Sequence, residues 1–339
     1  MTTAAAQATG GVEPTGRPDR LLEIDNLSVA FPTRGGPIYG VKGVTMNVGA
    51  RERIGVVGES GSGKSVTALA AMGLVQAPGR IVGGTVRWCG RDLAEPGVAE
   101  SVRGREIAMI FQDPMSSLTA LMTVERQICE VLTKRLGKTR AEAKLRALEL
   151  LELVGIPSPQ ERLKQFPFEF SGGMRQRVMI AIALAAEPKL LIADEPTTAL
   201  DVTIQAQILQ LLSNLSKELD VAVMMITHDL GVVAEFCDRV QVMYAGRIVE
   251  RSPVESMFAD PLHPYSAGLI ASSPRVDTVR DRLSSIAGDP APHADAVPGC
   301  PFSPRCSEAG DRCTHEVPEL LQVGDRRWVA CWKRTGDTR

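Results

Sequence analysis

The sequence predicts an α/β fold in which a P-loop (RecA-like) core is joined to an antiparallel β subdomain, a helical insert subdomain and a small Cys-rich C-terminal extension. Three observations predict it. A G-x-x-x-x-G-K-[ST] motif at residues 58–65 follows a short apolar run and precedes a helix-favouring one. Strand-like apolar runs return at residues 190–193 and 221–226, each after helical sequence, as in a parallel sheet covered by helices. From about residue 261 proline and cysteine recur and apolar periodicity weakens, which indicates a small module that needs external staples.

The length and charge of the chain limit its class. At 339 residues it has room for a core domain of roughly 200–250 residues and a smaller one. Its 38 Lys and Arg residues nearly balance its 40 Asp and Glu residues, which argues against a broad basic face for nucleic acid. Residues 1–20 lack the apolar stretch of a signal peptide, so we expect a disordered leader. The longest apolar run, residues 178–186, is too short to span a bilayer, so we expect a soluble or peripheral protein in the cytoplasm.

The elements follow from the hydrophobic pattern. Residues 27–31 and 44–48 alternate apolar with polar or small residues around a Gly-Gly-Pro turn, which predicts antiparallel strands. Residues 85–88 and 107–111 continue the strand pattern. The P-loop is therefore expected in a mixed sheet whose first part is antiparallel.

A helical insert is predicted over about residues 115–175. Thr139 and Glu142 have the spacing of a capping box, and a helix after them is expected to end before Gly155. Its apolar stripe indicates core packing rather than a cofactor site. The stripe consists of Leu145, Leu148, Leu151 and Val154.

The motif at residues 58–65 predicts a phosphate-binding loop, although an ordinary Gly/Ser turn is the alternative. Its glycines let backbone N–H groups turn toward a phosphate, and the following helix N-terminus adds partial positive charge. The lysine is expected to reach the β and γ phosphates and the serine hydroxyl to bind Mg²⁺. The residues expected to hold the nucleotide here are Gly58, Ser60, Gly61, Gly63, Lys64 and Ser65.

Polar side chains follow three of the predicted strands. Asp194 and Glu195 end the run at residues 190–193, where Asp194 is expected beside Mg²⁺ and Glu195 near the attacking water. Gln112 and His228 directly follow two further strands, whose carboxyl ends face the same crevice in an open α/β sheet. Each of these residues alone also fits a solvated loop, and the complete P-loop upstream favours the catalytic interpretation.

Residues 170–176, Phe-Ser-Gly-Gly-Met-Arg-Gln, open a helix predicted over residues 174–186. The amides and hydroxyl of Ser171, Gly172 and Gly173 form a second anion-binding helix terminus, although serine is also a common N-cap. With the phosphate loop and the carboxylate pair, this stretch resembles the ATP-binding subunits of ABC transporters over roughly residues 21–251.

The resemblance implies a role for each matching residue. Phe31 is expected to stack on adenine, residues 58–65 are the Walker A loop, and Ser171, Gly172 and Gly173 are the signature motif. Gln112 matches the Q-loop, Asp201 the D-loop and His228 the switch histidine. The implied catalytic residues are Glu195, His228 and Gln112, and the implied Mg²⁺ ligands are Ser65, Gln112 and Asp194.

The resemblance also implies an assembly. In the family, the signature motif of one subunit completes the nucleotide site of a second ATPase subunit, identical or homologous, so that two ATP molecules are enclosed between them. Two transmembrane permease subunits and an extracytoplasmic peptide-binding protein are the other implied partners, with no nucleic acid. The implied location is peripheral, on the cytoplasmic face of the inner membrane.

The C-terminal part indicates the cargo. Residues 261–269 and 299–306 resemble the extension found on oligopeptide and dipeptide importer ATPases. This divides the chain into a leader (1–20), an ABC ATPase domain (21–258) and the extension (259–339). The predicted function is ATP hydrolysis that drives peptide import. Import of another small solute, such as a nickel complex or glutathione, a soluble non-transport ABC ATPase and a P-loop kinase are the alternatives, and a kinase would leave the signature helix unexplained.

Four of the seven cysteines lie in this extension. Cys300, Cys306, Cys313 and Cys331 occur in a proline-rich segment with little core of its own, and their spacing lacks paired C-x₂-C knuckles. We therefore predict a [4Fe–4S] cluster, which occurs in this importer subfamily, with Zn²⁺ or no metal as alternatives. The remaining cysteines, at positions 89, 129 and 237, are expected to be small buried hydrophobic residues.

Overall fold

The computed structural model describes residues 20–198, 200–273, 286–291 and 293–335. The predicted leader lies outside the described residues, except for Arg20, which begins the first strand. The strands are β1 (Arg20–Thr33), β2 (Gly36–Gly49), β3 (Arg53–Val57), β4 (Arg80–Trp88), β5 (Arg91–Asp92), β6 (Ile107–Ile110), β7 (Leu190–Asp194), β8 (Ala222–Thr227), β9 (Arg239–Tyr244), β10 (Arg247–Pro253), β11 (Leu321–Gly324) and β12 (Arg327–Val329). The α-helices are α1 (Lys64–Ala71), α2 (Val98–Val102), α3 (Pro114–Ser117), α4 (Val124–Leu136), α5 (Arg140–Leu153), α6 (Pro159–Arg162), α7 (Gly172–Leu184), α8 (Val202–Glu218), α9 (Leu230–Phe236), α10 (Val254–Ala259), α11 (Pro264–Ser272) and α12 (Asp311–His315). Short 3₁₀ helices are η1 (Pro167–Glu169) and η2 (Ser303–Arg305).

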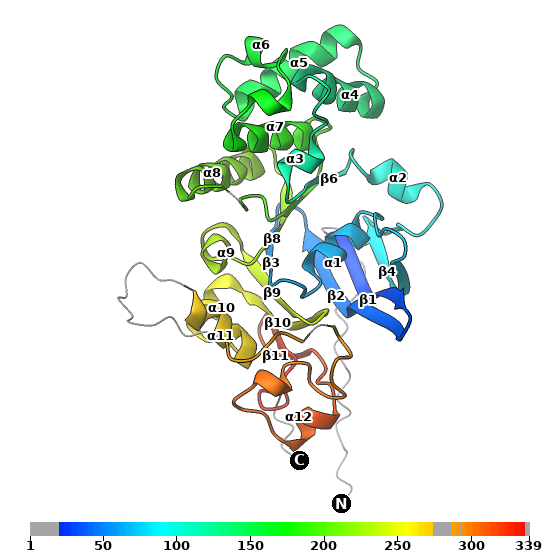
Figure 1. Cartoon of the computed structure of the whole chain (residues 1–339), viewed down its shortest axis with the longest axis vertical. Helices are drawn as coiled ribbons and strands as arrows, with labels where there is room; N and C mark the ends of the chain where they lie inside the picture. The colour runs from blue at the N-terminus through cyan, green and yellow to red at the C-terminus, as the bar shows by residue number, and fades with distance from the viewer. Residues whose placement is uncertain (1–19, 199, 274–285, 292, 336–339) are drawn as a thin grey trace, which may run out of the picture.

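The central sheet has the order β11-β12-β10-β9-β3-β8-β7-β6 (Figure 1). Strands β9, β3, β8, β7 and β6 are parallel, and β10, β12 and β11 continue the sheet antiparallel. Strands β7 and β8 are completely buried, as expected of parallel strands covered on both faces. The runs predicted to be strands in the second half of the core are therefore strands.

A separate antiparallel sheet, in the order β2-β1-β4-β5, confirms the alternating pattern of the N-terminal part. Its apolar face, which includes Leu27, Val44 and Trp88, packs with α1 and one face of the central sheet in a single buried cluster. Helix α1 begins at Lys64, within the phosphate-binding motif. This packing fixes the helix whose N-terminus faces that motif.

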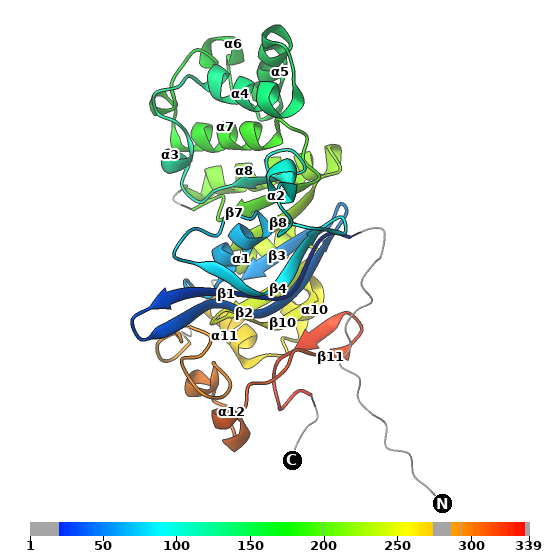
Figure 2. The ribbon, with the colours of Figure 1, turned by 90° about the vertical axis from the view of Figure 1, so that its right-hand side faces the viewer.

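The helical insert contains α3 to α7 and lies at the opposite end of the molecule from α12 (Figures 1 and 2). The capping box of Thr139 and Glu142 is present at the start of α5. The stripe prediction was wrong at Leu145, which is 65% exposed. Ala143 and Ala147 occupy the buried face instead, because small side chains let α5 approach α4 and α7 closely.

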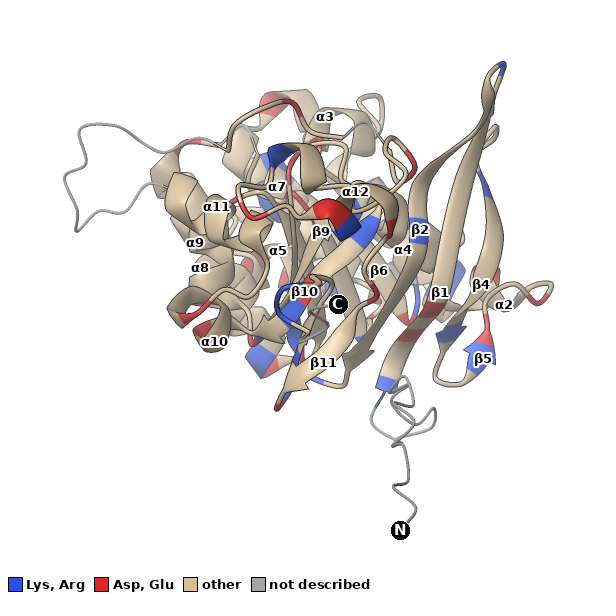
Figure 3. Ribbon diagram, turned by 90° about the horizontal axis from the view of Figure 1, so that it is seen from below, with Lys and Arg blue, Asp and Glu red and all other residues tan. Residues whose placement is uncertain are grey.

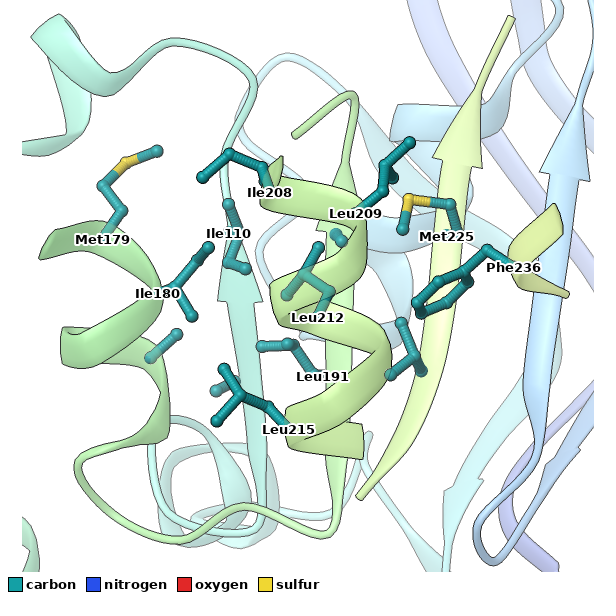
Figure 4. Close-up of a cluster of buried hydrophobic side chains, with 14 of the residues drawn as sticks. Ile110, Met179, Ile180, Leu191, Ile208, Leu209, Leu212, Leu215, Met225 and Phe236 are labelled. Carbon is teal, nitrogen blue, oxygen red and sulfur yellow. The ribbon is translucent and has the colours of Figure 1, made fainter. Parts of the chain in front are cut away.

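Helix α8 joins the insert to the central sheet. In Figure 4 its side chains Ile208, Leu212 and Leu215 lie between Ile180 of α7 on one side and Phe236 of α9 on the other. All of these residues belong to one buried cluster that also contains the residues on one face of β6, β7 and β8. Met174 near the start of α7 and Ile204 near the start of α8 pack against the same cluster.

The C-terminal extension packs against the central sheet and shares its core, so it does not depend on a core of its own. Strand β12 pairs with β10, with Glu250 opposite Val329, and so extends the central sheet. Tyr265 and Phe302, which are 0% and 3% exposed, belong to the large core cluster. The sequence did not reveal this packing, because its contacts join segments that are far apart in the sequence and β12 is added at the edge of β10.

Basic and acidic residues are interspersed along the described part of the chain (Figure 3). Among the described residues, no helix combines the length and the apolar character needed to cross a membrane.

Candidate active site

The phosphate loop connects β3 to α1 in a conformation that requires glycine. The backbone φ angle is +154° at Gly58 and +100° at Gly63. A Cβ atom at Gly58 would lie 2.2 Å from the carbonyl oxygen of Met243, and one at Gly63 would lie 2.5 Å from that of Gly40. Both neighbours are backbone atoms and cannot move aside easily. Ser60 and Gly61 lie exposed at the tip of the loop.

The Lys64 ammonium lies inside this loop. Its Nζ donates to the carbonyl oxygens of Gly58 and Glu59, both at 2.8 Å, and to Ser62 Oγ at 3.3 Å. Burial lowers the pKa of Lys64, and the charges of Glu195, Asp194 and Glu59 oppose that shift. The cation is therefore partly desolvated and surrounded by oxygen atoms at the position that the motif assigns to phosphate contact.

Ser65 and Asp194 form an oxygen pair next to the lysine. Ser65 Oγ donates to Asp194 Oδ1 at 3.1 Å. Burial raises the pKa of Asp194, and the charge of Glu195 adds to the effect, while the hydrogen bond from Ser65 opposes it. A hydroxyl beside a desolvated carboxylate is a donor set that fits Mg²⁺, whose charge would stabilise the carboxylate anion.

Glu195 is held by side chains from three other positions. Its Oε2 accepts from Gln112 Nε2 and from Thr198 Oγ1, each at 2.9 Å, and its Oε1 lies 3.2 Å from His228 Nδ1. Burial acts to raise the pKa of Glu195, but the hydrogen bonds of Thr198 and His228 and nearby positive charge outweigh it, so the pKa is lowered. The side chain is thus kept ionised and oriented.

The backbone of Glu195 has an unusual conformation. Its φ angle is +46°, in the left-handed region, which costs energy for a residue other than glycine. Its N–H donates to the carbonyl oxygen of Ile226 at 2.8 Å. This bond to the end of β8 holds the strained residue at the carboxyl edge of the sheet, where β6, β7 and β8 also deliver Gln112, Asp194 and His228.

The signature residues are placed elsewhere. Ser171 is the N-cap of α7, and its Oγ accepts from Met174 N at 3.4 Å. A Cβ atom at Gly173 would lie 2.7 Å from Ile204 Cγ2 of α8, and Gly172 lies beside Leu200. Asp201 caps α8 by accepting from Ile204 N at 2.9 Å. Within the described residues, no hydrogen bond joins residues 171–173 to the phosphate loop, so the structure does not bring these two predicted parts together.

Phe31 lies near the end of β1, opposite Ile38 of β2. Its ring packs against Gly40 and Gly79, where added Cβ atoms would lie 2.9 Å and 2.5 Å from ring carbons. Gly40 is also the residue whose carbonyl oxygen closely approaches Gly63. Gly40 therefore contacts both the aromatic ring and Gly63 of the phosphate loop. This placement of the ring fits a base-stacking residue.

Thr198 is a site residue that sequence reasoning missed. It follows Glu195 by three positions in a Glu-Pro-Thr-Thr turn, so a hydroxyl at that spacing was the available signal. Two further contacts, from Tyr265 and Arg305 to Glu59, had no local signal because they span more than 200 residues of sequence.

The four C-terminal cysteines line one small pocket together with His263 and Trp332. Burial raises the pKa of Cys300 to about 11 and also raises the pKa values of Cys306 and Cys331. Among the described residues, however, no group of three or more His, Cys, Asp or Glu side chains is arranged to hold a metal ion. The predicted [4Fe–4S] cluster is therefore not supported by the structure.

The expectation for the remaining cysteines holds only in part. Cys237 is buried and Cys129 is half-buried, but Cys89 is exposed. Cys89 and Gly90 form the two-residue turn between β4 and β5, both with positive φ angles. Such a turn projects from the sheet edge, so the turn geometry overrides the usual preference of cysteine for the interior.

The fold and this grouping define a P-loop ATPase, in which a phosphate loop, a hydroxyl–carboxylate pair and an oriented glutamate meet at the carboxyl edge of a parallel sheet. Comparison with known proteins agrees. Residues 41–198 match the family described as ABC transporter, and residues 249–313 match the oligopeptide/dipeptide transporter C-terminal region.

Relatives cover nearly the whole chain. The oligopeptide transport ATP-binding protein OppD of Bacillus subtilis is 51% identical over 93% of this chain and 89% of that protein. OppD of Salmonella typhimurium is 48% identical over 92% and 93%. Among solved structures, the dimeric post-hydrolysis state of the ATP-binding cassette MJ0796 bound to ADP and Pi has a TM-score of 0.62 at 27% identity, covering 69% of this chain and 99% of that chain. The chain belongs to the ABC transporter family and is an ABC-type ATPase.

Proposed function

We propose that the chain is the ATP-hydrolysing subunit that powers peptide import through an ABC transporter permease. The observation that supports hydrolysis most directly is the fixed Glu195 carboxylate beside the Ser65–Asp194 pair. The peptide cargo is supported by the relatives, which are named oligopeptide transport ATP-binding proteins, and by the match of residues 249–313.

The chemistry follows from the positions of the side chains. Backbone N–H groups of the loop and the N-terminus of α1 bind the phosphates, and Lys64 Nζ reaches the β and γ phosphates. Ser65, Asp194 and Gln112 would hold Mg²⁺, and the ion would supply positive charge that stabilises the phosphate oxygens. Glu195 accepts a hydrogen bond from the attacking water, while His228 contacts the γ-phosphate.

The proposed assembly contains a second, identical or homologous, ATPase subunit. The separation of residues 171–173 from the phosphate loop of the same chain supports a site shared between two chains, and MJ0796, at 27% identity, has been solved as a dimer. Two permease subunits and an extracytoplasmic peptide-binding protein complete the proposal, with the ATPase on the cytoplasmic face of the inner membrane.

Transport by the reconstituted complex tests this function. Proteoliposomes that contain the permease and this subunit should accumulate a labelled oligopeptide only with ATP, and Glu195→Gln should abolish uptake. Glu149→Gln, which changes an exposed glutamate of the helical insert, is the matched control and should transport normally. Uptake of glutathione or a nickel complex in place of peptide would overturn the assigned cargo but not the ATPase.

We also propose that the four C-terminal thiols bind a metal centre, a [4Fe–4S] cluster or Zn²⁺. The support is that all four line one pocket. As placed, these described side chains do not form a metal-binding group, so a bound centre requires the thiols to rearrange. Iron, sulfide and zinc analysis of anaerobically purified protein decides, because stoichiometric metal should be lost in Cys306→Ser. Metal-free protein of unchanged stability would refute the proposal.

A further inference from the structure

We propose that Arg305 and Tyr265, both from the C-terminal part, are positioning residues that hold Glu59 and thereby set the conformation of the phosphate loop for ATP. This inference rests on the proposal that residues 58–65 are the ATP site. It makes the C-terminal part a component of nucleotide binding.

Arg305 forms a two-pronged ion pair with the Glu59 side chain. Its Nη1 lies 2.7 Å from Oε2 and its Nη2 lies 3.0 Å from Oε1. The Arg305 side chain is only 4% exposed and that of Glu59 is 26% exposed. Arg305 Nε also donates to the carbonyl oxygen of Ala287 at 2.9 Å, which fixes the guanidinium itself. Such a desolvated, bidentate ion pair restricts both the position and the orientation of the Glu59 carboxylate.

Tyr265 holds the backbone of the same residue. Its hydroxyl oxygen accepts from Glu59 N at 2.8 Å. The ring is completely buried and packs edge-on against Tyr244, with ring centroids 4.7 Å apart, and against Phe302 at 5.4 Å. The hydroxyl therefore has a fixed position. Glu59 is held by its side chain and by its N–H, from two separate segments of the C-terminal part.

Glu59 transmits this restraint into the loop. Its carbonyl oxygen accepts from Lys64 Nζ at 2.8 Å and from Ser62 N at 3.2 Å. It also follows Gly58, the residue with a φ angle of +154°. A shift of Glu59 would therefore change the positions of Lys64 and of the loop amides. A preorganised loop binds phosphate without an ordering cost at the moment of binding.

Arg239 and Glu52 provide a matched comparison. Arg239 Nε lies 2.8 Å from Glu52 Oε1, and the two side chains are 8% and 19% exposed. This pair is buried to a similar degree as Arg305–Glu59, but Glu52 precedes β3 and forms no hydrogen bond with the loop among the described residues. Loss of the Arg239–Glu52 ion pair should lower the melting temperature without changing the nucleotide affinity.

The experiment compares Arg305→Met with Arg239→Met in the full-length chain. We measure the melting temperature and the affinity for a fluorescent ATP analogue with Mg²⁺. Both variants should melt at lower temperature, but only Arg305→Met should weaken nucleotide binding, by about tenfold, because its loop must be ordered on binding. Equal affinities for Arg305→Met and wild type, or equal losses in both variants, would overturn the proposal.

Two further variants keep the test decisive if Arg305→Met does not fold. Tyr265→Phe removes only the acceptor of the Glu59 N–H and should weaken nucleotide binding about threefold, because one hydrogen bond is lost. In the Glu59→Gln background, Arg305→Lys should lower the nucleotide affinity by less than about a further twofold, since both changes act on one contact. Fully multiplicative losses would show that Arg305 acts elsewhere.

Lys64→Ala separates this inference from its premise. Loss of analogue binding in Lys64→Ala establishes the loop as the ATP site. If that variant loses binding while Arg305→Met and Tyr265→Phe bind as wild type, only the positioning role is refuted. If Lys64→Ala binds as wild type, the premise itself is wrong.

Discussion

Glu195 depends on its neighbours for both charge and orientation. Gln112, Thr198 and His228 reach it from different segments, and each contacts one of its two carboxylate oxygens. A carboxylate that is fixed in this way can act on a water molecule without first reorganising. The two neighbouring acids have different partners, because Asp194 accepts a hydrogen bond from Ser65 of the phosphate loop.

Glu195→Gln should bind ATP as tightly as wild type but lose at least about a hundredfold in turnover, since a neutral amide cannot serve as a general base. Phosphate release and analogue binding, measured on the same preparation, check this. The variant should also accumulate as an ATP-bound dimer in size-exclusion chromatography. Wild-type hydrolysis by Glu195→Gln would contradict the role assigned to Glu195, and Glu149→Gln controls for loss of a carboxylate.

Thr198→Val should lower kcat by about three- to tenfold with little change in KM, because it removes one hydrogen bond of about 1 kcal/mol from a group that acts only in the chemical step. Thr198→Ser retains the hydroxyl and should remain near wild type. Steady-state ATPase kinetics of both variants distinguish the hydroxyl from the methyl group. A fall in kcat of equal size in Thr198→Ser would show that packing, not the hydrogen bond, matters.

At the scale of elements, α7 and α8 form a tightly packed unit that presents the signature residues. Gly173 faces Ile204 so closely that a methyl group has no room beside it. Both helix starts are capped by side chains, by Ser171 in α7 and by Asp201 in α8. Residues 171–173 and Asp201 are therefore held in one packed unit, which would form a single surface toward the proposed second subunit.

Gly173→Ala should separate α7 from α8 and lower ATPase turnover, while nucleotide binding by the single chain remains. A second change, Ile204→Ala, makes space for the new methyl group and should restore much of the turnover, because overpacking is relieved when the facing side chain is shortened. ATPase assays of the single and double variants, with analogue binding as the control, test this. Equal defects in both variants would refute the packing explanation.

At the scale of the whole molecule, sequence reasoning predicted local patterns well and long-range packing poorly. The capping box at Thr139 and the strand that ends at Asp194 are encoded by neighbouring residues, so their positions could be predicted. The pairing of β12 with β10 and the contacts of Arg305 and Tyr265 with Glu59 could not be predicted. Their partners lie far apart in the sequence, and no periodic pattern links them. The exposed Leu145 shows the same limit, since helical spacing does not say which neighbour covers a stripe.

The proposed dimer predicts complementation between two inactive variants. Lys64→Ala removes the phosphate grip of its own chain, and Ser171→Arg blocks the surface offered to the partner chain. Each variant alone should be inactive, but Ser171→Arg should still bind the ATP analogue. In an equimolar mixture about half of the dimers are mixed, and each has one intact composite site, so turnover should recover to about a quarter of wild type if pairing is random. Mixing Lys64→Ala with Asp194→Asn, which damages the same half of the site, should recover nothing. If both proteins are folded and the mixture of Lys64→Ala with Ser171→Arg recovers no turnover, two copies of this chain do not form a shared ATP site.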